Sequence, residues 1–105
     1  MNFNINENKL KDVIFRFLDL KGLDIVQVDT FRTFFISNEN QSKETKMIYR
    51  ELGNYLYIVR ELFDDIKDFF SLDSDLTKKI ISKWVENKLN TNVLIVRKVY
   101  LLPND

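Results

Sequence analysis

The chain has 105 residues, and its 16 basic and 16 acidic side chains give a formal net charge of zero. It contains no cysteine and no histidine, which excludes disulfides, thiolate metal sites, cysteine nucleophiles and imidazole chemistry. With 45% hydrophobic residues, the chain has enough apolar material for one folded domain over residues 1–105. Apolar runs are short, such as Val93–Val96, and the N-terminus does not resemble a signal peptide, so we expect a cytoplasmic protein without membrane contact.

The composition is biased toward asparagine, lysine, isoleucine, phenylalanine and tyrosine, and alanine is absent. The favoured residues have AT-rich codons, whereas alanine has GC-rich ones. The bias therefore suggests an AT-rich source genome, and an accessory protein of a phage or mobile element is one hypothesis about its origin.

The first predicted element is a helix, because one set of apolar residues follows the spacing of a single helical face. These residues are Leu10, Val13, Ile14, Phe17 and Leu18. Asn6 or Asn8 is placed to cap its start, and Gly22 follows its end. Lys21 in the last turn would suit the helix dipole.

Residues 23–36 change to a pattern rich in β-branched and aromatic residues, which indicates extended structure. Two-residue hairpin turns prefer pairs such as Asn-Gly, and Asp29-Thr30 is not such a pair. We therefore expect one long, bent strand here, although two strands are the alternative. Residues 37–45 are polar and predict a loop.

A hairpin is predicted next, because two β-prone runs, 47–52 and 55–58, flank Gly53-Asn54. The helical period then returns for two further helices. The first has the apolar face Val59, Leu62, Phe63, Ile66 and Phe70, widened by Phe69. The second, over residues 75–89, has the apolar face Leu76, Ile80, Ile81, Trp84, Val85 and Leu89.

Caps and a final strand complete the pattern. Asp73 or Ser74 can cap the third helix, and Asn90 or Asn92 can end it in a left-handed conformation. Residues 93–102 then predict a strand that Pro103 stops. The order helix, strand, hairpin, helix, helix, strand predicts an α+β domain with about four antiparallel or mixed strands and three helices.

Catalytic chemistry finds little support in these residues, and we predict a non-enzymatic protein without a cofactor. Asp64, Asp65 and Asp68 are the one candidate cluster for a hard cation such as Mg²⁺ or Ca²⁺. The same three residues lie opposite the apolar face of their helix. A solvated polar face is therefore the preferred interpretation.

Charge is unevenly distributed along the C-terminal half. Residues 60–76 have a balance of −4, and residues 77–98 have a balance of +5. The two helices can screen one another, or they can orient a partner or stack copies head to tail. The candidate interaction surface consists of Asp64, Asp65, Asp68, Lys78, Lys79 and Lys83.

Nucleic-acid binding is the alternative function. A helix-turn-helix over residues 59–89 would present the basic helix 75–89 to a groove, with Arg97 and Lys98 as a wing. The acidic preceding helix and the neutral total charge argue against it. A stacking platform is also conceivable from the aromatic residues Phe31, Phe34, Phe35, Tyr49, Tyr55 and Tyr57. Core packing is the commoner fate of such residues, and Trp84 fits the core in particular.

The strands carry apolar residues on both faces, which a sheet with one solvated face would not require. Phe31 and Phe35 alternate with Phe34 and Ile36, and the final strand shows the same property. We therefore expect association with another chain, as a homo-oligomer or with a different protein. The leading functional hypothesis is a small protein-interaction module that binds a protein partner or itself.

Overall fold

Three helices and five strands make up residues 7–39 and 43–103, the part of the chain that the computed structural model describes. The elements are α1 (Glu7–Leu20), β1 (Asp24–Gln27), β2 (Arg32–Ser37), β3 (Glu44–Arg50), β4 (Tyr55–Val59), α2 (Arg60–Phe69), α3 (Ser74–Leu89) and β5 (Ile95–Val99). The predicted α+β class is confirmed, with five strands where about four were expected. No helix in these ranges has both the length and the apolar character that crossing a membrane requires.

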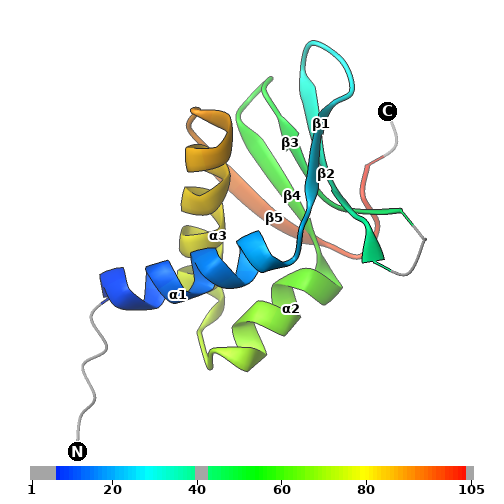
Figure 1. The fold of residues 1–105 in the computed structure, drawn as a ribbon. Helices are drawn as coiled ribbons and strands as arrows, with labels where there is room; N and C mark the ends of the chain where they lie inside the picture. Colours follow the sequence, from blue (N-terminus) through cyan, green and yellow to red (C-terminus); the bar gives the residue numbers. More distant parts are fainter. Residues whose placement is uncertain (1–6, 40–42, 104–105) are drawn as a thin grey trace, which may run out of the picture.

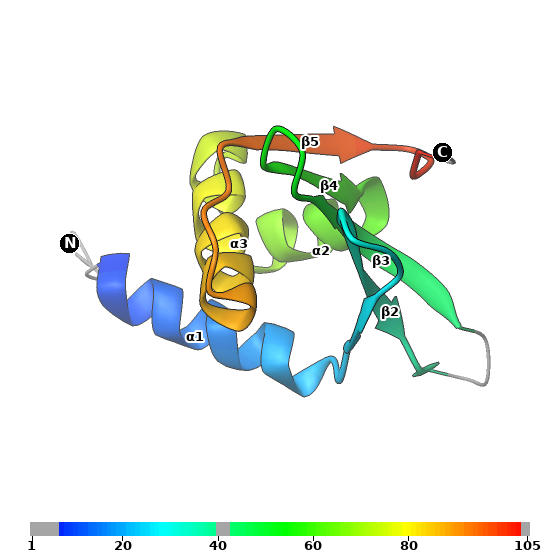
Figure 2. The ribbon, with the colours of Figure 1, turned by 90° about the horizontal axis from the view of Figure 1, so that it is seen from above.

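The sheet has the order β1-β2-β3-β4-β5, and only β5 runs parallel to its neighbour. The first four strands form an antiparallel meander, and α2 with α3 makes the crossover from β4 to β5. All three helices lie on one face of the sheet (Figures 1 and 2). We call the opposite face, which no helix covers, the open face.

The core lies between the sheet and the helices. Strand residues that point toward the helices, such as Phe35, Met47, Leu56 and Ile58, are fully buried. Trp84 of α3 packs against Phe35, with ring centroids 5.6 Å apart, so its predicted place in the core is confirmed.

The prediction of one bent strand over residues 23–36 is wrong, because β1 and β2 pair with each other as a hairpin. Asp29 makes this turn without a glycine. Its carboxylate accepts hydrogen bonds from the backbone N–H groups of Phe31 and Arg32, both at 2.9 Å, and from Arg32 Nε at 2.8 Å. The Asp29 side chain thus provides the hydrogen bonds that stabilise this turn, whereas an Asn-Gly pair would stabilise a turn through its backbone conformation.

The hairpin around Gly53-Asn54 is confirmed, and both residues have positive φ, 84° and 54°. The loop includes Glu51 and Leu52, so it is longer than a two-residue turn. The cap of α3 is also as expected. Asp73 Oδ1 accepts from the Leu76 N–H at 2.7 Å, and Asn90 ends the helix with φ 51°.

Some local predictions differ from the structure. Asn8 lies within α1 and so does not cap it, and Asn6 lies outside the described residues. Lys21 follows the last turn of α1. Val13 and Phe69 follow the apolar spacing of their helices but are exposed, because each lies at the border of its packed face.

The last strand is shorter than the predicted 93–102. It begins at Ile95 and ends at Val99, four residues before Pro103. Only this part has β4 alongside it to complete the backbone hydrogen bonds.

Hydrogen bonds of Tyr49 connect the β3–β4 loop to the segment between α3 and β5. Its buried hydroxyl lies 2.6 Å from Asn54 Oδ1 and 3.2 Å from the Asn92 carbonyl oxygen, to which it can donate. It also lies 3.0 Å from the Thr91 hydroxyl. This contact helps to place β5 beside β4.

Tyr49→Phe should therefore lower the free energy of unfolding by about 1–2 kcal/mol, because the half-buried Asn54 and Thr91 lose their hydrogen bond to the buried ring's hydroxyl. Urea denaturation measures the change. Tyr57→Phe is the matched control, since the Tyr57 hydroxyl has no hydrogen-bond partner among the described residues. Equal effects of the two substitutions would contradict this role of Tyr49.

Asp19 of α1 connects to two residues of α3. Its Oδ1 atom accepts from Trp84 Nε1 at 3.0 Å and lies 2.8 Å from Lys88 Nζ. The hydrogen bond from Lys88, followed by that from Trp84, lowers the pKa of the Asp19 carboxyl below its ordinary value. Because the folded-state pKa is lowered, this contact stabilises the fold at neutral pH and is lost as the carboxyl becomes protonated.

We expect the free energy of unfolding to fall as the pH drops below about 4, with Asp19 contributing to the fall. Asp19→Asn should show a shallower pH dependence, and Lys88→Ala should change it in the same direction. Denaturant titrations between neutral and acidic pH test this. Identical profiles for the wild type and Asp19→Asn would disprove the contribution.

Candidate interaction surface

Asp64 contacts basic residues on two elements. Its carboxylate lies 3.1 Å from Arg60 Nε, on the same helix, and 3.2 Å from Lys98 Nζ on β5. Desolvation acts to raise the pKa of this carboxyl, but the hydrogen bonds from Lys98 and Arg60 outweigh it and the pKa is lowered. Asp64 therefore stabilises the junction of α2 and β5.

Asp65 and Asp68 do not join Asp64 in a metal site. Both are exposed, and Asp68 lies 3.7 Å from the neighbouring Lys67 Nζ. Within the described ranges, no group of three or more carboxylates is close enough to hold a metal ion. These two residues are therefore charges at the surface of α2.

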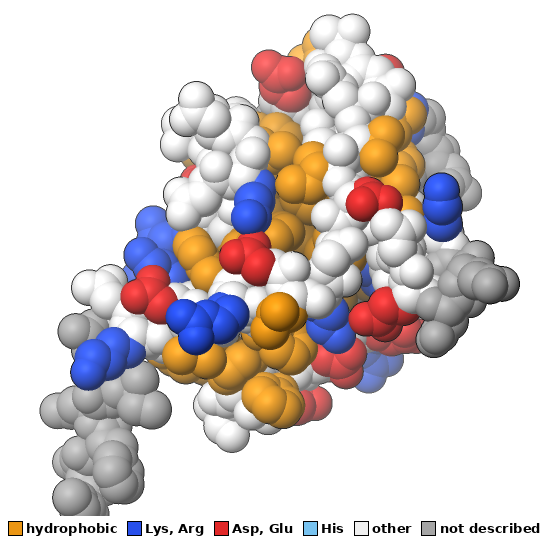
Figure 3. Space-filling view, in the orientation of Figure 1, with side chains coloured by type: hydrophobic (Ala, Val, Ile, Leu, Met, Phe, Trp, Pro, Cys, Tyr) orange, Lys and Arg blue, Asp and Glu red, His pale blue; other side chains and the backbone are white. Residues whose placement is uncertain are grey.

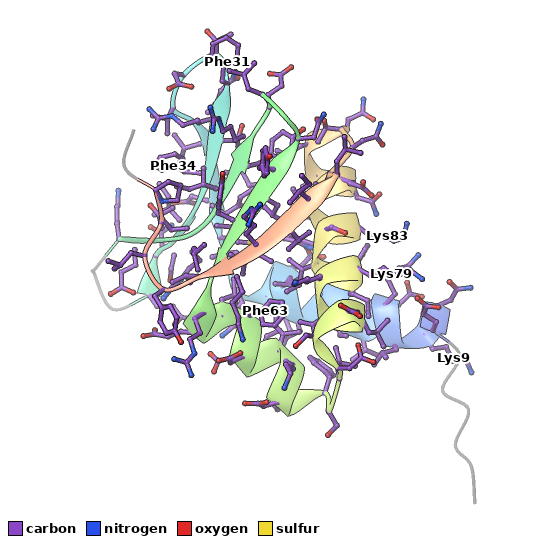
Figure 4. The ribbon with its side chains drawn as sticks, turned by 180° about the vertical axis from the view of Figure 1, so that it is seen from behind. Lys9, Phe31, Phe34, Phe63, Lys79 and Lys83 are labelled. Carbon is purple, nitrogen blue, oxygen red and sulfur yellow. The ribbon has the colours of Figure 1, made fainter. Side chains whose placement is uncertain are left out.

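The three predicted lysines of α3 have different surroundings. Lys79 Nζ forms an ion pair with Glu7 of α1 at 2.7 Å, and this hydrogen bond is the main reason that the pKa of Glu7 is lowered. Lys83 is exposed and forms no ion pair with any described residue. Lys79 and Lys83 point outward on the side of the molecule where Lys9 lies (Figure 4). Lys78 is half-buried beside Phe63.

The oppositely charged helices α2 and α3 do not screen each other through direct ion pairs. No ion pair joins α2 to α3 in the part of the chain that the structure describes. The lysines of α3 pair with α1, through Lys79–Glu7 and Lys88–Asp19, while the acidic α2 pairs with Lys98 of β5. The six predicted residues therefore do not form one site.

The strand that was suggested as the wing of a helix-turn-helix does not form a wing. β5 is a strand of the main sheet, paired with β4. Lys98 points to the helix-covered side, where it meets Asp64, whereas its neighbour Arg97 points to the open face. The two cations therefore lie on opposite faces of the sheet and do not form the shared basic surface that a wing would present.

The open face has a coherent set of side chains that come from all five strands. The strand register and the alternation of side chains place the following residues on it: Val26, Arg32, Phe34, Ile36, Ile48, Arg50, Tyr55, Tyr57, Val59, Ile95, Arg97 and Val99. Most of them are partly exposed. The predicted apolar character of both strand faces is thus explained by a core on one side and this surface on the other.

Aromatic rings and guanidinium groups contact one another on the open face. The rings of Tyr55 and Tyr57 stack with centroids 6.0 Å apart. Arg97 lies 5.8 Å from the Tyr55 ring centre, and Arg32 lies 5.7 Å from that of Phe34. The strand cations on this face are all arginines, which bind carboxylates in a planar, two-pronged manner that lysine cannot provide.

The C-terminal segment lies along part of the open face and forms a groove with it. The groove has a volume of about 590 Å³ and lies between Leu101–Pro103 and the strands β2 and β3. Phe34 and Ile48 form its apolar floor, and Arg32 contributes a cation. Phe34 points away from the helices (Figure 4). Ile48 is only 3% exposed although it faces away from the core.

The predicted aromatic platform is divided between the two faces. Phe35 and Tyr49 are buried in the core, Phe34, Tyr55 and Tyr57 lie on the open face, and Phe31 is exposed in the β1–β2 turn. The sequence did contain a signal for this surface, because Tyr55-Leu56-Tyr57-Ile58 alternates strictly between tyrosine and aliphatic residues. Arg97 was not predicted to belong to this surface, because its strand was considered as the wing of a helix-turn-helix.

Comparison with known proteins gives no family assignment. No protein-family model, curated protein or solved structure matches the chain significantly.

Removing residues 100–105 should uncover the apolar floor of the groove, because Leu101–Pro103 form its second wall. We expect the truncated chain to bind the dye ANS more strongly while its far-UV circular dichroism stays unchanged. Leu102→Ser in the full-length chain should produce a smaller increase. Unchanged dye binding in the truncated chain would show that the segment does not shield this surface.

Proposed function

We propose that this chain is a non-enzymatic protein-interaction module that binds a partner protein through the open face of its sheet. The observation that carries the proposal is the one-sided placement of the helices, which leaves an uncovered face with tyrosine, phenylalanine, aliphatic and arginine side chains. Tyrosine and arginine are enriched where protein interfaces are buried, and lysine is depleted there. The open face has this composition although lysine is more than twice as frequent as arginine in the whole chain.

The aliphatic residues favour a protein over a nucleic acid as the partner. Val26, Ile36, Val59, Ile95 and Val99 lie among the aromatic residues and offer nothing to a phosphate or a base edge. Burial of such residues stabilises a protein complex through the hydrophobic effect.

Nucleic-acid binding by helix 75–89 is the second candidate. The exposed Lys83 supports it, whereas Lys79 is already paired with Glu7. A gel shift that strengthens at low salt and is lost on Lys78/Lys79/Lys83→Ala would favour this alternative. The phage or mobile-element origin stays a hypothesis that rests on codon bias.

Affinity capture followed by a direct binding measurement with the purified partner tests the proposal. Tyr57→Asp should weaken the partner's binding at least about tenfold, because it places a charge in the middle of the open face. Lys83→Asp introduces the same side chain on α3, far from the open face, and should leave binding unchanged. A partner that is lost with Lys83→Asp and retained with Tyr57→Asp would refute this location.

A further inference from the structure

Two of the three strand arginines on the open face have no carboxylate partner. Arg50 of β3 is half-buried and Arg97 of β5 is exposed, and neither forms an ion pair with any described residue. Arg32, in contrast, already holds a carboxylate, because its Nε and Nη2 atoms each lie 2.8 Å from Asp29 Oδ2. The contact between Arg32 and Asp29 shows how a guanidinium group beside this face binds a carboxylate oxygen with two nitrogens.

The position of Arg50 adds to its need for an anion. Arg32 and Arg50 are directly opposite one another on β2 and β3. Like charges at opposed strand positions repel each other and destabilise a sheet. Asp29 compensates the charge of Arg32, whose hydrogen bond is the main reason that the pKa of the Asp29 carboxyl is lowered. An external carboxylate beside Arg50 would compensate the second charge.

Tyr55 and Tyr57 lie between the two unpaired arginines, since β4 separates β3 from β5. Arg50 is opposite Tyr55, and Arg97 is opposite Tyr57 and 5.8 Å from the Tyr55 ring centre. Neither tyrosine hydroxyl has a hydrogen-bond partner among the described residues. We call these four residues the tyrosine–arginine site. All four side chains can donate hydrogen bonds, so the site is suited to a negatively charged acceptor.

The Tyr55 ring is held in a fixed position within this site. It stacks on the Tyr57 ring with an angle of 14° between the planes. On another side it lies against Gly53, where an added Cβ atom would come within 2.5 Å of the ring. A ring that is already positioned loses little conformational entropy when a partner binds.

The charge of the site is not compensated nearby on the open face. Asp24 is the carboxylate that the described strands place on this face, and it lies on β1, at the opposite edge of the sheet from β5. The side of the molecule that carries α1 and α2 differs, because basic and acidic side chains are intermixed there (Figure 3). The tyrosine–arginine site therefore complements an acidic surface.

We propose that the partner of the open face binds it with an acidic peptide segment, whose carboxylates contact Arg50, Arg97 and the hydroxyls of Tyr55 and Tyr57. This inference rests on the proposed function, because it specifies what the partner presents to the same face. Ile95, opposite Tyr55 on β5, lies beside the site and offers an apolar contact to the rest of the segment.

The geometry favours a carboxylate-bearing peptide over single-stranded nucleic acid. Bases bind by stacking on free ring faces. The Tyr55 ring already contacts Tyr57 and Arg97, which leaves less of it for a base. Donor groups around the rings remain accessible to carboxylates at the edge of this stack.

Selection from a random peptide library, with the purified protein as bait, tests the chemistry of the partner. The peptides that the wild type selects should be enriched in aspartate and glutamate. They should not be retained by Tyr57→Asp, which disrupts the open face. A fluorescently labelled copy of one selected peptide then serves as the probe for affinity measurements.

Fluorescence anisotropy measures how the arginines contribute. Arg50→Gln/Arg97→Gln should raise the dissociation constant of the labelled peptide at least about tenfold. A peptide with amides in place of its carboxylates should bind the wild type weakly and lose little more with this variant, since both changes remove the same contacts. Lys9→Gln/Lys83→Gln is the matched control, because it also removes two exposed positive charges but lies on the helix side. Circular dichroism verifies that both variants are folded.

Two results would overturn the inference and leave the open face as the binding site. They are selected peptides that need Tyr57 but have no acidic excess, and equal binding of the acidic and amide peptides. A selection that yields no peptide dependent on Tyr57 would contradict the proposed function itself. A labelled oligothymidylate that binds more tightly than the selected peptides, and is lost with Arg50→Gln/Arg97→Gln, would identify a nucleic-acid ligand and also overturn the inference.

Discussion

The helices pack on only one face of the sheet, and this one-sided packing decides where nearly every strand side chain goes. Successive strand residues point to opposite sides, so each strand supplies one set to the core and another to the open face. Phe35 is buried against Trp84, while its neighbour Phe34 lies on the open face beside Arg32. The apolar character of both strand faces follows from this arrangement.

The same packing explains the distribution of charge. α3 lies beside α1 and uses Lys79 and Lys88 to bind Glu7 and Asp19, while the acidic α2 is bound by Lys98 of β5. The opposite balances of neighbouring segments thus reflect contacts with other parts of the fold.

Local features of the sequence predicted most elements correctly. The cap at Asp73, the end of α3 at Asn90 and the turn at Gly53-Asn54 all depend on residues within one or two turns of each other. The hairpin at Asp29 was missed because a side-chain carboxylate, and no glycine, makes that turn. Periodicity also assigned Phe69 to the core, since a spacing pattern does not show where the packed face ends.

The sequence by itself determined the α+β class, the order of the elements apart from the division of residues 23–36 into two strands, and the absence of thiol and imidazole chemistry, because these follow from composition and from local periodicity. Only the tertiary structure decided which side of each strand faces the helices, that Arg97 and Lys98 point in opposite directions, and that Phe17 meets Phe69. Such relations join residues far apart in the chain. They depend on how the layers pack, which no local pattern specifies.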